Sequence, residues 1–229
     1  AMSLNKLQKF EALKSMPNVY ENFSFTEPKL IRNQVEDNPK GHWKNRHFGN
    51  ENPLILELAC GKGEYSVALG EKYPDKNFLG IDIKGNRIHN GARIALEKNL
   101  SNVCFLRTRI ELMHEFIEGD EIDEIWITFP DPFPGFSDRG NRLISPKFLD
   151  YYKKLLNGKK IVFHLKTDNF PLFRYAVGVL DGRGEKIIRC IENIYGQDKK
   201  IEDILRVQTY YEKLHMGQGS QIHYVQWEM

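Results

Sequence analysis

The sequence has few cysteines, little net charge and no long apolar run, and each shortage excludes a class of protein. Its three cysteines, Cys60, Cys104 and Cys190, lie too far apart for a zinc motif, and their odd number argues against a disulfide framework. We therefore expect reduced, mostly buried thiols and no metal site. No apolar stretch approaches the ~20 residues that a membrane helix needs, so we expect no membrane association.

Charge by itself assigns no partner. The formal net charge is +2, which is compatible with a nucleic-acid ligand but does not require one. Residues 1–10 lack the apolar core of a signal peptide, so we expect a cytoplasmic protein. Basic residues concentrate at 40–47, together with Trp43 and the adjacent Phe48. Such a segment either holds phosphates and stacks on bases or is a solvated connection, and the pattern leaves both interpretations open.

The chain has the length of one α/β domain and a pattern of alternating strands and helices. Residues 1–42 predict a polar, partly helical leader with a helix at 3–15, and residues 43–229 predict the main domain. Leu54–Cys60 is a nearly continuous apolar run, which is typical of a strand buried on both faces of a parallel sheet.

The remaining elements follow at regular spacing. Strands are expected at 77–83, 103–106, 122–129, 160–165, 187–194 and 223–227, with helices up to Lys72 and at 86–99, 111–116, 146–156 and 170–180. The predicted fold is α/β, with a mostly parallel seven-stranded sheet, an antiparallel last strand and helices on both faces.

Two of these strands end in groups that suit a nucleoside. Gly61 and Gly63 follow the first strand, and they permit a tight turn and close approach of a ligand to the backbone. Asp82 closes the second strand, where a carboxylate can accept hydrogen bonds from both hydroxyls of a ribose. Because ligands of a parallel sheet bind beyond the carboxyl ends of its strands, these residues predict an adenosine site.

The residues around the glycines indicate which cofactor carries the adenosine. A dinucleotide fingerprint has a third glycine, and Ser66 stands at that position here. Glu57 lies just upstream, where a carboxylate is a poor neighbour for a pyrophosphate and a good one for an ammonium or sulfonium group. The pattern favours S-adenosyl-L-methionine, and a dinucleotide-dependent oxidoreductase is the weakest alternative.

The strongest chemical signal is the segment FPDPFP, Phe129–Pro134, directly after the fourth strand. Three prolines restrict the backbone around Asp131 and present its carboxylate at the edge of the sheet, beside the expected methyl donor. A proline-rich surface turn with an incidental Asp is the alternative, but it does not explain why a buried strand runs into it. Phe133 and Phe136 either stack on a base or pack beneath the loop, and His164 is expected to be a packed core residue.

An ordered set of motifs resembles the tRNA (guanine-N7)-methyltransferase family. The matching residues are Glu57–Gly63, Gly80–Ile83, Phe129–Pro134, Arg142–Leu143, Phe148–Leu149, Lys166–Asn169 and Thr209–Glu212, with Phe48–Asn50 before the first strand. The resemblance extends in consistent order from Trp43 to the C-terminus. It implies a Rossmann-like class I methyltransferase fold, S-adenosyl-L-methionine as cofactor and tRNA as partner, methylated at N7 of a variable-loop guanine.

The resemblance also implies roles for individual residues. Glu57, Asp82 and Asp131 match positions that contact S-adenosyl-L-methionine, and Asp131 matches the catalytic position. With Gly61, Gly63 and Arg109 they make up the expected cofactor site. Substrate binding is expected of Arg142, Asp168, Thr209, Tyr210, Tyr211 and Glu212.

Three positions depart from the family pattern. Ala59 occupies a position that is commonly glycine. Arg109 stands where the family usually has an Asp near the adenine, so this contact passes to Arg109 itself or to the backbone. Gly135 replaces a substrate-binding Lys, and the loop after it has only Arg139 and Arg142 as basic residues. Phosphate affinity is therefore expected to be weaker in this loop or to come from another basic segment.

The methyl acceptor constrains the chemistry. Guanine N7 has a lone pair and no proton, so no general base is needed, and a carboxylate such as Asp131 or Asp168 can instead recognise the guanine and stabilise the cationic product. Two alternatives stay open. An amino methyltransferase for adenine in nucleic acid has an Asp/Asn-Pro-Pro-aromatic motif, and Asp131–Phe133 lacks its second proline. A non-catalytic RNA-binding subunit of the same fold is the other, and the oligomeric state, monomer or homodimer, is not fixed.

Overall fold

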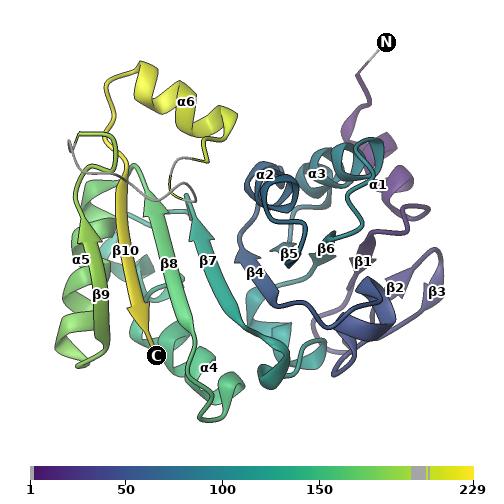
Figure 1. The fold of residues 1–229 in the computed structure, drawn as a ribbon, viewed down its shortest axis with the longest axis horizontal. Helices are drawn as coiled ribbons and strands as arrows, with labels where there is room; N and C mark the ends of the chain where they lie inside the picture. Colours follow the sequence, from purple (N-terminus) through teal and green to yellow (C-terminus); the bar gives the residue numbers. More distant parts are fainter. Residues whose placement is uncertain (1–2, 197–204, 206) are drawn as a thin grey trace. The chain divides into compact units, whose positions relative to one another are not determined.

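The computed structural model describes residues 3–196, 205 and 207–229 (Figure 1). These residues form two compact units, which divide between Ile122 and Asp123, and each is described by itself.

The first unit is built on a sheet with the strand order β3-β2-β1-β6-β5-β4. Neighbouring strands are parallel from β1 to β4 in this order, and β2 and β3 add antiparallel pairs. The strands are β1 (Val19–Glu21), β2 (Ile31–Arg32), β3 (Val35–Glu36), β4 (Leu54–Leu58), β5 (Asn77–Asp82) and β6 (Val103–Arg107). The helices are α1 (Lys6–Leu13), α2 (Glu64–Lys72) and α3 (Gly85–Glu97), with a π-helical turn at Trp43–Phe48 and 3-10 turns at Ile110–Glu115 and Gly119–Glu121.

The apolar runs of the sequence form the core of this unit. Every residue of β4 and β5 is buried, as expected for strands that are covered on both faces. Helix α3 contributes Ile88, Ala92 and Ala95, which lie at helical spacing and are buried. Burial of these apolar surfaces fixes the strands side by side, so their carboxyl ends meet at one edge of the sheet.

The second unit has the strand order β7-β8-β10-β9. Strands β7 (Glu124–Thr128) and β8 (Val162–Thr167) are parallel, whereas β10 (His223–Glu228) is antiparallel to both β8 and β9 (Lys186–Ile191). The helices are α4 (Pro146–Leu156), α5 (Phe170–Gly182) and α6 (Tyr210–Gly217), with a 3-10 turn at Phe136–Asn141. Ser145 and Asn169 cap α4 and α5, and a proline in the first turn of each fixes where the helix begins.

The structure confirms the α/β fold, the seven predicted strands and the antiparallel last strand. It adds β1, β2 and β3, which are two or three residues long and therefore too short to show a periodic pattern. Helix α6 was not expected either, and the helix predicted at 111–116 is a 3-10 turn. The predicted boundary between residues 42 and 43 stays a prediction. Among the described residues, no helix combines the length and apolarity needed to cross a membrane.

Candidate cofactor and substrate sites

Glu57 is a buried carboxylate near the end of β4 that is held by helix α2. Its Oε1 atom accepts hydrogen bonds from the Ser66 amide at 3.2 Å and from the Ser66 hydroxyl at 2.7 Å. Ser66 stands where a dinucleotide fingerprint would have glycine, so the residue that breaks that fingerprint also orients Glu57. The buried negative charge lies directly before the glycine turn, where it suits a cationic group of a ligand.

Asp82 is fixed at the carboxyl end of β5 by two backbone amides. Its Oδ2 accepts from the Gly61 amide at 2.9 Å, and its Oδ1 accepts from the Lys84 amide at 2.8 Å. An ionised carboxylate has about four acceptor positions. Two such bonds therefore orient Asp82 and leave acceptor capacity on both oxygens for the hydroxyls of a ribose.

The glycine turn between these carboxylates fits a ligand that approaches the backbone. Gly61 has a φ of +56°, and a Cβ placed there would project into open space. At Gly63, with a φ of +71°, a Cβ would lie 2.5 Å from the Phe105 ring, so this position excludes a side chain for packing reasons. Ala59 also has a positive φ of 56°, a conformation that favours the glycine commonly found there and is strained for alanine.

Arg109 lies beyond the end of β6 and is exposed. Its guanidinium lies 5.4 Å from the centre of the Phe25 ring. The neighbouring Thr108 is buried, and its amide donates to the Asp82 carbonyl at 3.1 Å. Arg109 is thus in the same unit as Glu57, Gly61, Gly63 and Asp82, and its role toward the cofactor stays a prediction.

In the second unit, Asp131 lies on a turn whose backbone is strained on both sides. Phe129 has a φ of 48° and Phe133 a φ of 42°, values that bulky residues rarely adopt. The turn is held in place because the Phe129 amide donates to the Lys166 carbonyl at 2.8 Å, and Arg142 donates to the carbonyls of Pro132 and Phe133 at 2.8 and 3.0 Å. Strain of this kind accumulates at functional sites, where the surrounding structure enforces it.

Arg142 is therefore not positioned as an accessible side chain that could bind a phosphate. It is buried, and its guanidinium lies 4.4 Å from the centre of the Tyr175 ring. Its expected part in substrate binding stays a prediction, and its contacts favour an indirect part through the shape of the turn. Phe136 in the following loop is 82% exposed, so it does not pack beneath the loop.

Asp168, at the end of β8, is surrounded by side chains of α6. Its Oδ2 lies 3.1 Å from Nδ1 of His215, and the His215 ring packs at a tilt against Tyr211 with ring centres 4.0 Å apart. Burial raises the pKa of Tyr211, and the charges of Asp168 and Asp131 together with a hydrogen bond to Asp168 raise it further. Asp168 thus contacts α6, and Tyr211 of the same helix is affected by the charges of both Asp168 and Asp131.

A buried ion pair holds α6 against β8. Lys166 and Glu212 are completely buried, with 3.0 Å between Nζ and Oε1, and Lys166 also donates to the carbonyls of Leu205 and Val207. The Tyr195 hydroxyl donates to Glu212 at 2.5 Å. Glu212 was expected to bind substrate, and that role stays a prediction; its carboxylate is completely buried against Lys166 and Tyr195.

The other residues of the predicted Thr209–Glu212 motif have separate positions. Thr209 caps α6 by accepting from the Glu212 amide at 3.1 Å, and Tyr210 is exposed. Tyr211 packs on Phe129 with ring centres 5.1 Å apart, so it links α6 to the turn that carries Asp131. Ser66, Lys166 and His215 are organising residues that the sequence pattern did not predict, although Lys166 lies in one of the matching motifs and Ser66 stands in place of the third glycine of a dinucleotide fingerprint.

The expectation for His164 is confirmed. It is buried and stacks on Trp126 at 3.8 Å between ring centres, and its ring nitrogens contact Tyr224 and Glu124 at 2.7 Å. The thiols of Cys60 and Cys104 are buried, and burial raises the pKa of both, whereas Cys190 is exposed. The prediction that Glu57, Asp82, Asp131 and Asp168 share one pocket concerns both units and stays a prediction.

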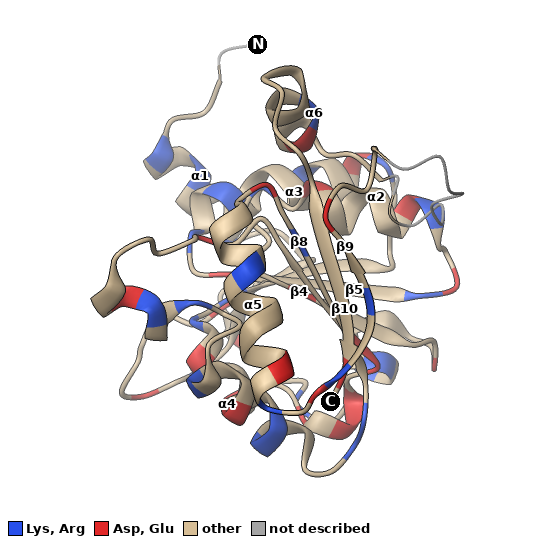
Figure 2. Cartoon of the chain, turned by 90° about the vertical axis from the view of Figure 1, so that its left-hand side faces the viewer, with Lys and Arg blue, Asp and Glu red and all other residues tan. Residues whose placement is uncertain are grey.

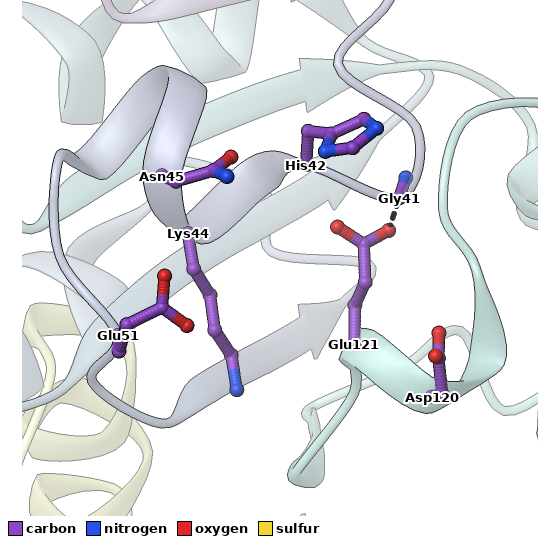
Figure 3. A pocket seen from close by; sticks show the side chains of 7 residues that line it. All are labelled: Gly41, His42, Lys44, Asn45, Glu51, Asp120 and Glu121. Carbon is purple, nitrogen blue, oxygen red and sulfur yellow. Dashed lines mark hydrogen bonds between the residues drawn. The ribbon is translucent and has the colours of Figure 1, made fainter.

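The basic segment at 40–47 is tied to the protein. Trp43 is completely buried, which excludes it as a platform for bases, and Lys40 and Arg46 pair with Glu118 and Asp37 at 3.4 and 2.6 Å. A pocket of about 180 Å³ opens here, before the start of β4 rather than beyond its end. It is lined by Gly41, His42, Lys44, Asn45, Glu51, Asp120 and Glu121 (Figure 3).

The lining of this pocket carries both signs of charge. Glu121 accepts from the amides of Gly41, Trp43 and Glu118 at 2.7 to 2.9 Å, so it holds the backbone of the segment together. Lys and Arg are likewise interspersed with Asp and Glu along the ribbon in Figure 2. The distribution of charged residues therefore does not locate a nucleic-acid surface. The carboxyl ends of the strands remain the best candidate site.

A family model and two similar sequences agree on one chemistry. A family model described as putative methyltransferase matches residues 51–225. The chain is 40% identical over 230 residues to the tRNA (guanine-N(7)-)-methyltransferase of Christiangramia forsetii, with 99% of each chain covered. It is 39% identical over 228 residues to the tRNA (guanine-N(7)-)-methyltransferase of Bacteroides thetaiotaomicron, covering 100% of this chain and 87% of the relative.

Solved structures are similar in fold. An antibiotic-related methyltransferase has a TM-score of 0.61 at 18% identity, covering 85% of this chain and 96% of that one. The 16S rRNA methyltransferase KamB has a TM-score of 0.59 at 12% identity, covering 85% of this chain and 95% of that one. At such identities the likeness shows the fold alone, which is the methyltransferase fold expected from the sequence.

Proposed function

The chain belongs to the tRNA (guanine-N7)-methyltransferase family, and on that basis we propose which of its residues carry out each part of the reaction. It is an S-adenosyl-L-methionine-dependent enzyme that methylates N7 of guanine in tRNA. That the guanine lies in the variable loop, that the enzyme is cytoplasmic and that it is a monomer or homodimer are parts of the proposal.

The first unit binds the cofactor, which supplies an electrophilic methyl group when bound. Asp82 accepts hydrogen bonds from the ribose hydroxyls, because both of its oxygens are oriented by backbone amides. Glu57, oriented by Ser66, neutralises the cationic methionine portion. The open space beside Gly61 allows the ligand to approach the backbone there.

The second unit positions the guanine. Because N7 attacks through its own lone pair, Asp131 and Asp168 do not act as general bases. One carboxylate accepts hydrogen bonds from guanine N1–H and N2–H₂, which distinguishes guanine from adenine, and its charge stabilises the cation that forms on the purine. Holding donor and acceptor in line contributes on the order of 7–11 kcal/mol. An exposed aromatic ring such as Phe136 stacks on a splayed-out base.

One arrangement carries this assignment: Tyr211 packs on Phe129, in the turn that carries Asp131, and His215 of the same helix lies 3.1 Å from Asp168, so α6 links the turn that carries Asp131 to Asp168. In a site that recognises a base with two adjacent N–H donors, such an arrangement supplies the acceptors. Family membership then identifies the base as guanine.

The test is methylation of unmodified tRNA by wild type and Asp131→Ala, read out by N7-specific strand cleavage. We expect the variant to lose about 10²–10³-fold in rate, because a carboxylate aimed at the developing charge is removed. Its dissociation constant for S-adenosylhomocysteine should change far less. Asp150→Ala, which removes an exposed carboxylate on α4, is the matched control. Unchanged activity of Asp131→Ala would remove this residue from the mechanism.

Mass spectrometry of the product nucleoside distinguishes methylation of guanine from methylation of adenine. N7-methylguanosine is expected, and the turn Asp131–Phe133 lacks the second proline of amino methyltransferases. A product with N6-methyladenine would overturn the assignment of guanine as the base.

A further inference from the structure

The N-terminal segment reaches the cofactor edge of the sheet through β1. Strand β1 is parallel to β6, and Glu21 is in register with Arg107, which is itself in register with Asp82 on β5. The three residues therefore form one row across neighbouring strands. Because all three strands run in the same direction, the chain that follows Glu21 emerges at the edge where Asp82 binds the ribose.

The loop that emerges there, Asn22–Lys29, is fastened to the end of β6. The Asn22 amide donates to the Arg107 carbonyl at 2.8 Å, and its side-chain amide donates to the Thr108 hydroxyl at 3.3 Å. The Asn22 side-chain oxygen accepts from the amides of Ser24 and Lys29 at 3.2 Å, which closes the loop. These bonds hold the loop beside Arg109, the residue directly after Thr108.

Large apolar side chains are exposed at this edge. Phe23 is 61% exposed, Phe25 is 58% exposed, and Ile83, directly after Asp82, is 47% exposed. The guanidinium of Arg109 lies 5.4 Å from the centre of the Phe25 ring. Exposed aromatic rings close to the carboxyl ends of parallel strands are unfavourable for the free protein and suited to cover a flat ligand.

The order of the strands gives the direction in which the cofactor extends. The methionine portion lies at Glu57 on β4 and the ribose at Asp82 on β5. Since β5 lies between β4 and β6, the adenine, on the other side of the ribose from the methionine, extends toward β6 and the loop beside it.

We propose that Phe25 and Arg109 form the wall of the adenine subsite, so that the N-terminal loop Asn22–Lys29 is part of the cofactor site. This inference rests on the proposed function. A guanidinium has donors and no acceptor, so Arg109 cannot take the hydrogen bond that a carboxylate takes from the adenine amino group. Recognition then depends on stacking, with the purine covered by the Phe25 ring and by the face of the guanidinium.

Calorimetric titration with S-adenosylhomocysteine tests the stacking part, because it needs neither tRNA nor turnover. Phe25→Ala is expected to bind about tenfold more weakly, whereas Phe25→Tyr retains the ring and the affinity. Tyr73→Ala is the matched control, since it removes a ring that pairs with Lys76, away from the strand ends, and should leave affinity unchanged. Thermal melting of each variant checks that the fold is retained. Wild-type affinity in a folded Phe25→Ala variant would overturn the proposal.

The purine-riboside analogue of S-adenosylhomocysteine, which has hydrogen in place of the adenine amino group, tests the Arg109 part. Wild type is expected to bind both ligands within about threefold, because stacking is insensitive to that group. Arg109→Asp supplies an acceptor and should favour the adenine compound by about tenfold. Strong discrimination by wild type, or none gained by Arg109→Asp, would overturn this part. Failure of the proposed function would look different: wild type would bind no S-adenosylhomocysteine or make no N7-methylguanosine.

Discussion

The two units hold the carboxylates of the proposed sites by different means. In the first unit, Glu57 is bonded to Ser66 in the helix that follows its strand, and Asp82 is bonded to the Lys84 amide and to the amide of Gly61 in the turn after the neighbouring strand β4. In the second unit, Asp168 contacts His215 on a helix that comes much later in the sequence, and that helix is held by the buried Lys166–Glu212 pair.

This difference separates a locally built site from one assembled by distant contacts. Two neighbouring strands, a glycine turn and the first turns of a helix are enough to orient Glu57 and Asp82, so the proposed cofactor half is built within residues 54–84. The proposed substrate half depends on α6, which the buried Lys166–Glu212 pair holds in place. Removal of one partner would leave an uncompensated buried charge and destabilise this contact. Changes remote from the substrate should therefore disturb the second unit more than the first.

The largest expected effect comes from Lys166→Met, which leaves Glu212 as an unpaired buried charge. We expect a loss of about 3–5 kcal/mol in the free energy of unfolding, measured by urea denaturation. The double variant Lys166→Met with Glu212→Leu should regain most of this stability, because no unpaired charge remains. It should still methylate tRNA slowly, since α6 is no longer held by the pair.

Lys186→Met is the control for that experiment. Lys186 forms an exposed pair with Glu228 at 3.3 Å, and its loss should cost less than about 1 kcal/mol. If Lys166→Met were no more harmful than Lys186→Met, the contrast between the two units would not hold.

The next largest effect is a loss of stability of the first unit at low pH. His47 lies within 2.9 Å of the Tyr20 hydroxyl, and burial, with a smaller contribution from Arg32, lowers its pKa to about 4 from 6.5. Because the folded state resists protonation, the stability that His47 contributes is fully present above about pH 6.5 and is lost as the pH falls toward about 4. The full loss amounts to about 3 kcal/mol.

Urea denaturation between about pH 7 and about pH 4 measures this dependence. His47→Gln should unfold with a flatter pH profile than wild type, because a neutral amide replaces the titrating ring. His114→Gln, at an exposed histidine, should keep the wild-type profile. An unchanged slope in His47→Gln would show that acid acts through other groups.

The smallest expected effect concerns the hydrogen bonds by which Ser66 orients Glu57 in the proposed cofactor half. Ser66→Ala removes the 2.7 Å bond from the hydroxyl to Glu57 but leaves the amide bond in place. We expect cofactor binding to weaken about fivefold, or about 1 kcal/mol, by calorimetry with S-adenosylhomocysteine. Ser66→Thr retains the hydroxyl and should restore most of the affinity. Equal affinities for all three proteins would mean that the amide alone orients Glu57.

Sequence patterns predicted the cofactor half better than the substrate half. Buried parallel strands appear as continuous apolar runs, so the ends of β4 and β5, with the glycine turn between them, could be located. Asp131 stands out in the sequence because three prolines mark its turn, and its role stays a prediction. The Lys166–Glu212 pair and the position of α6 could not be predicted, because a contact between residues far apart in the chain leaves no periodic pattern in the sequence.

The sequence by itself determined the alternation of strands and helices and the carboxylates at the strand ends, because apolar periodicity, glycine and proline act over a few residues. Only the tertiary structure decided that β1 joins the sheet in parallel and brings Phe25 beside Arg109, and that a buried ion pair positions Tyr211 and His215 around Asp168. Both depend on which distant segments bury surface together, and that follows from packing of the whole unit rather than from any local pattern.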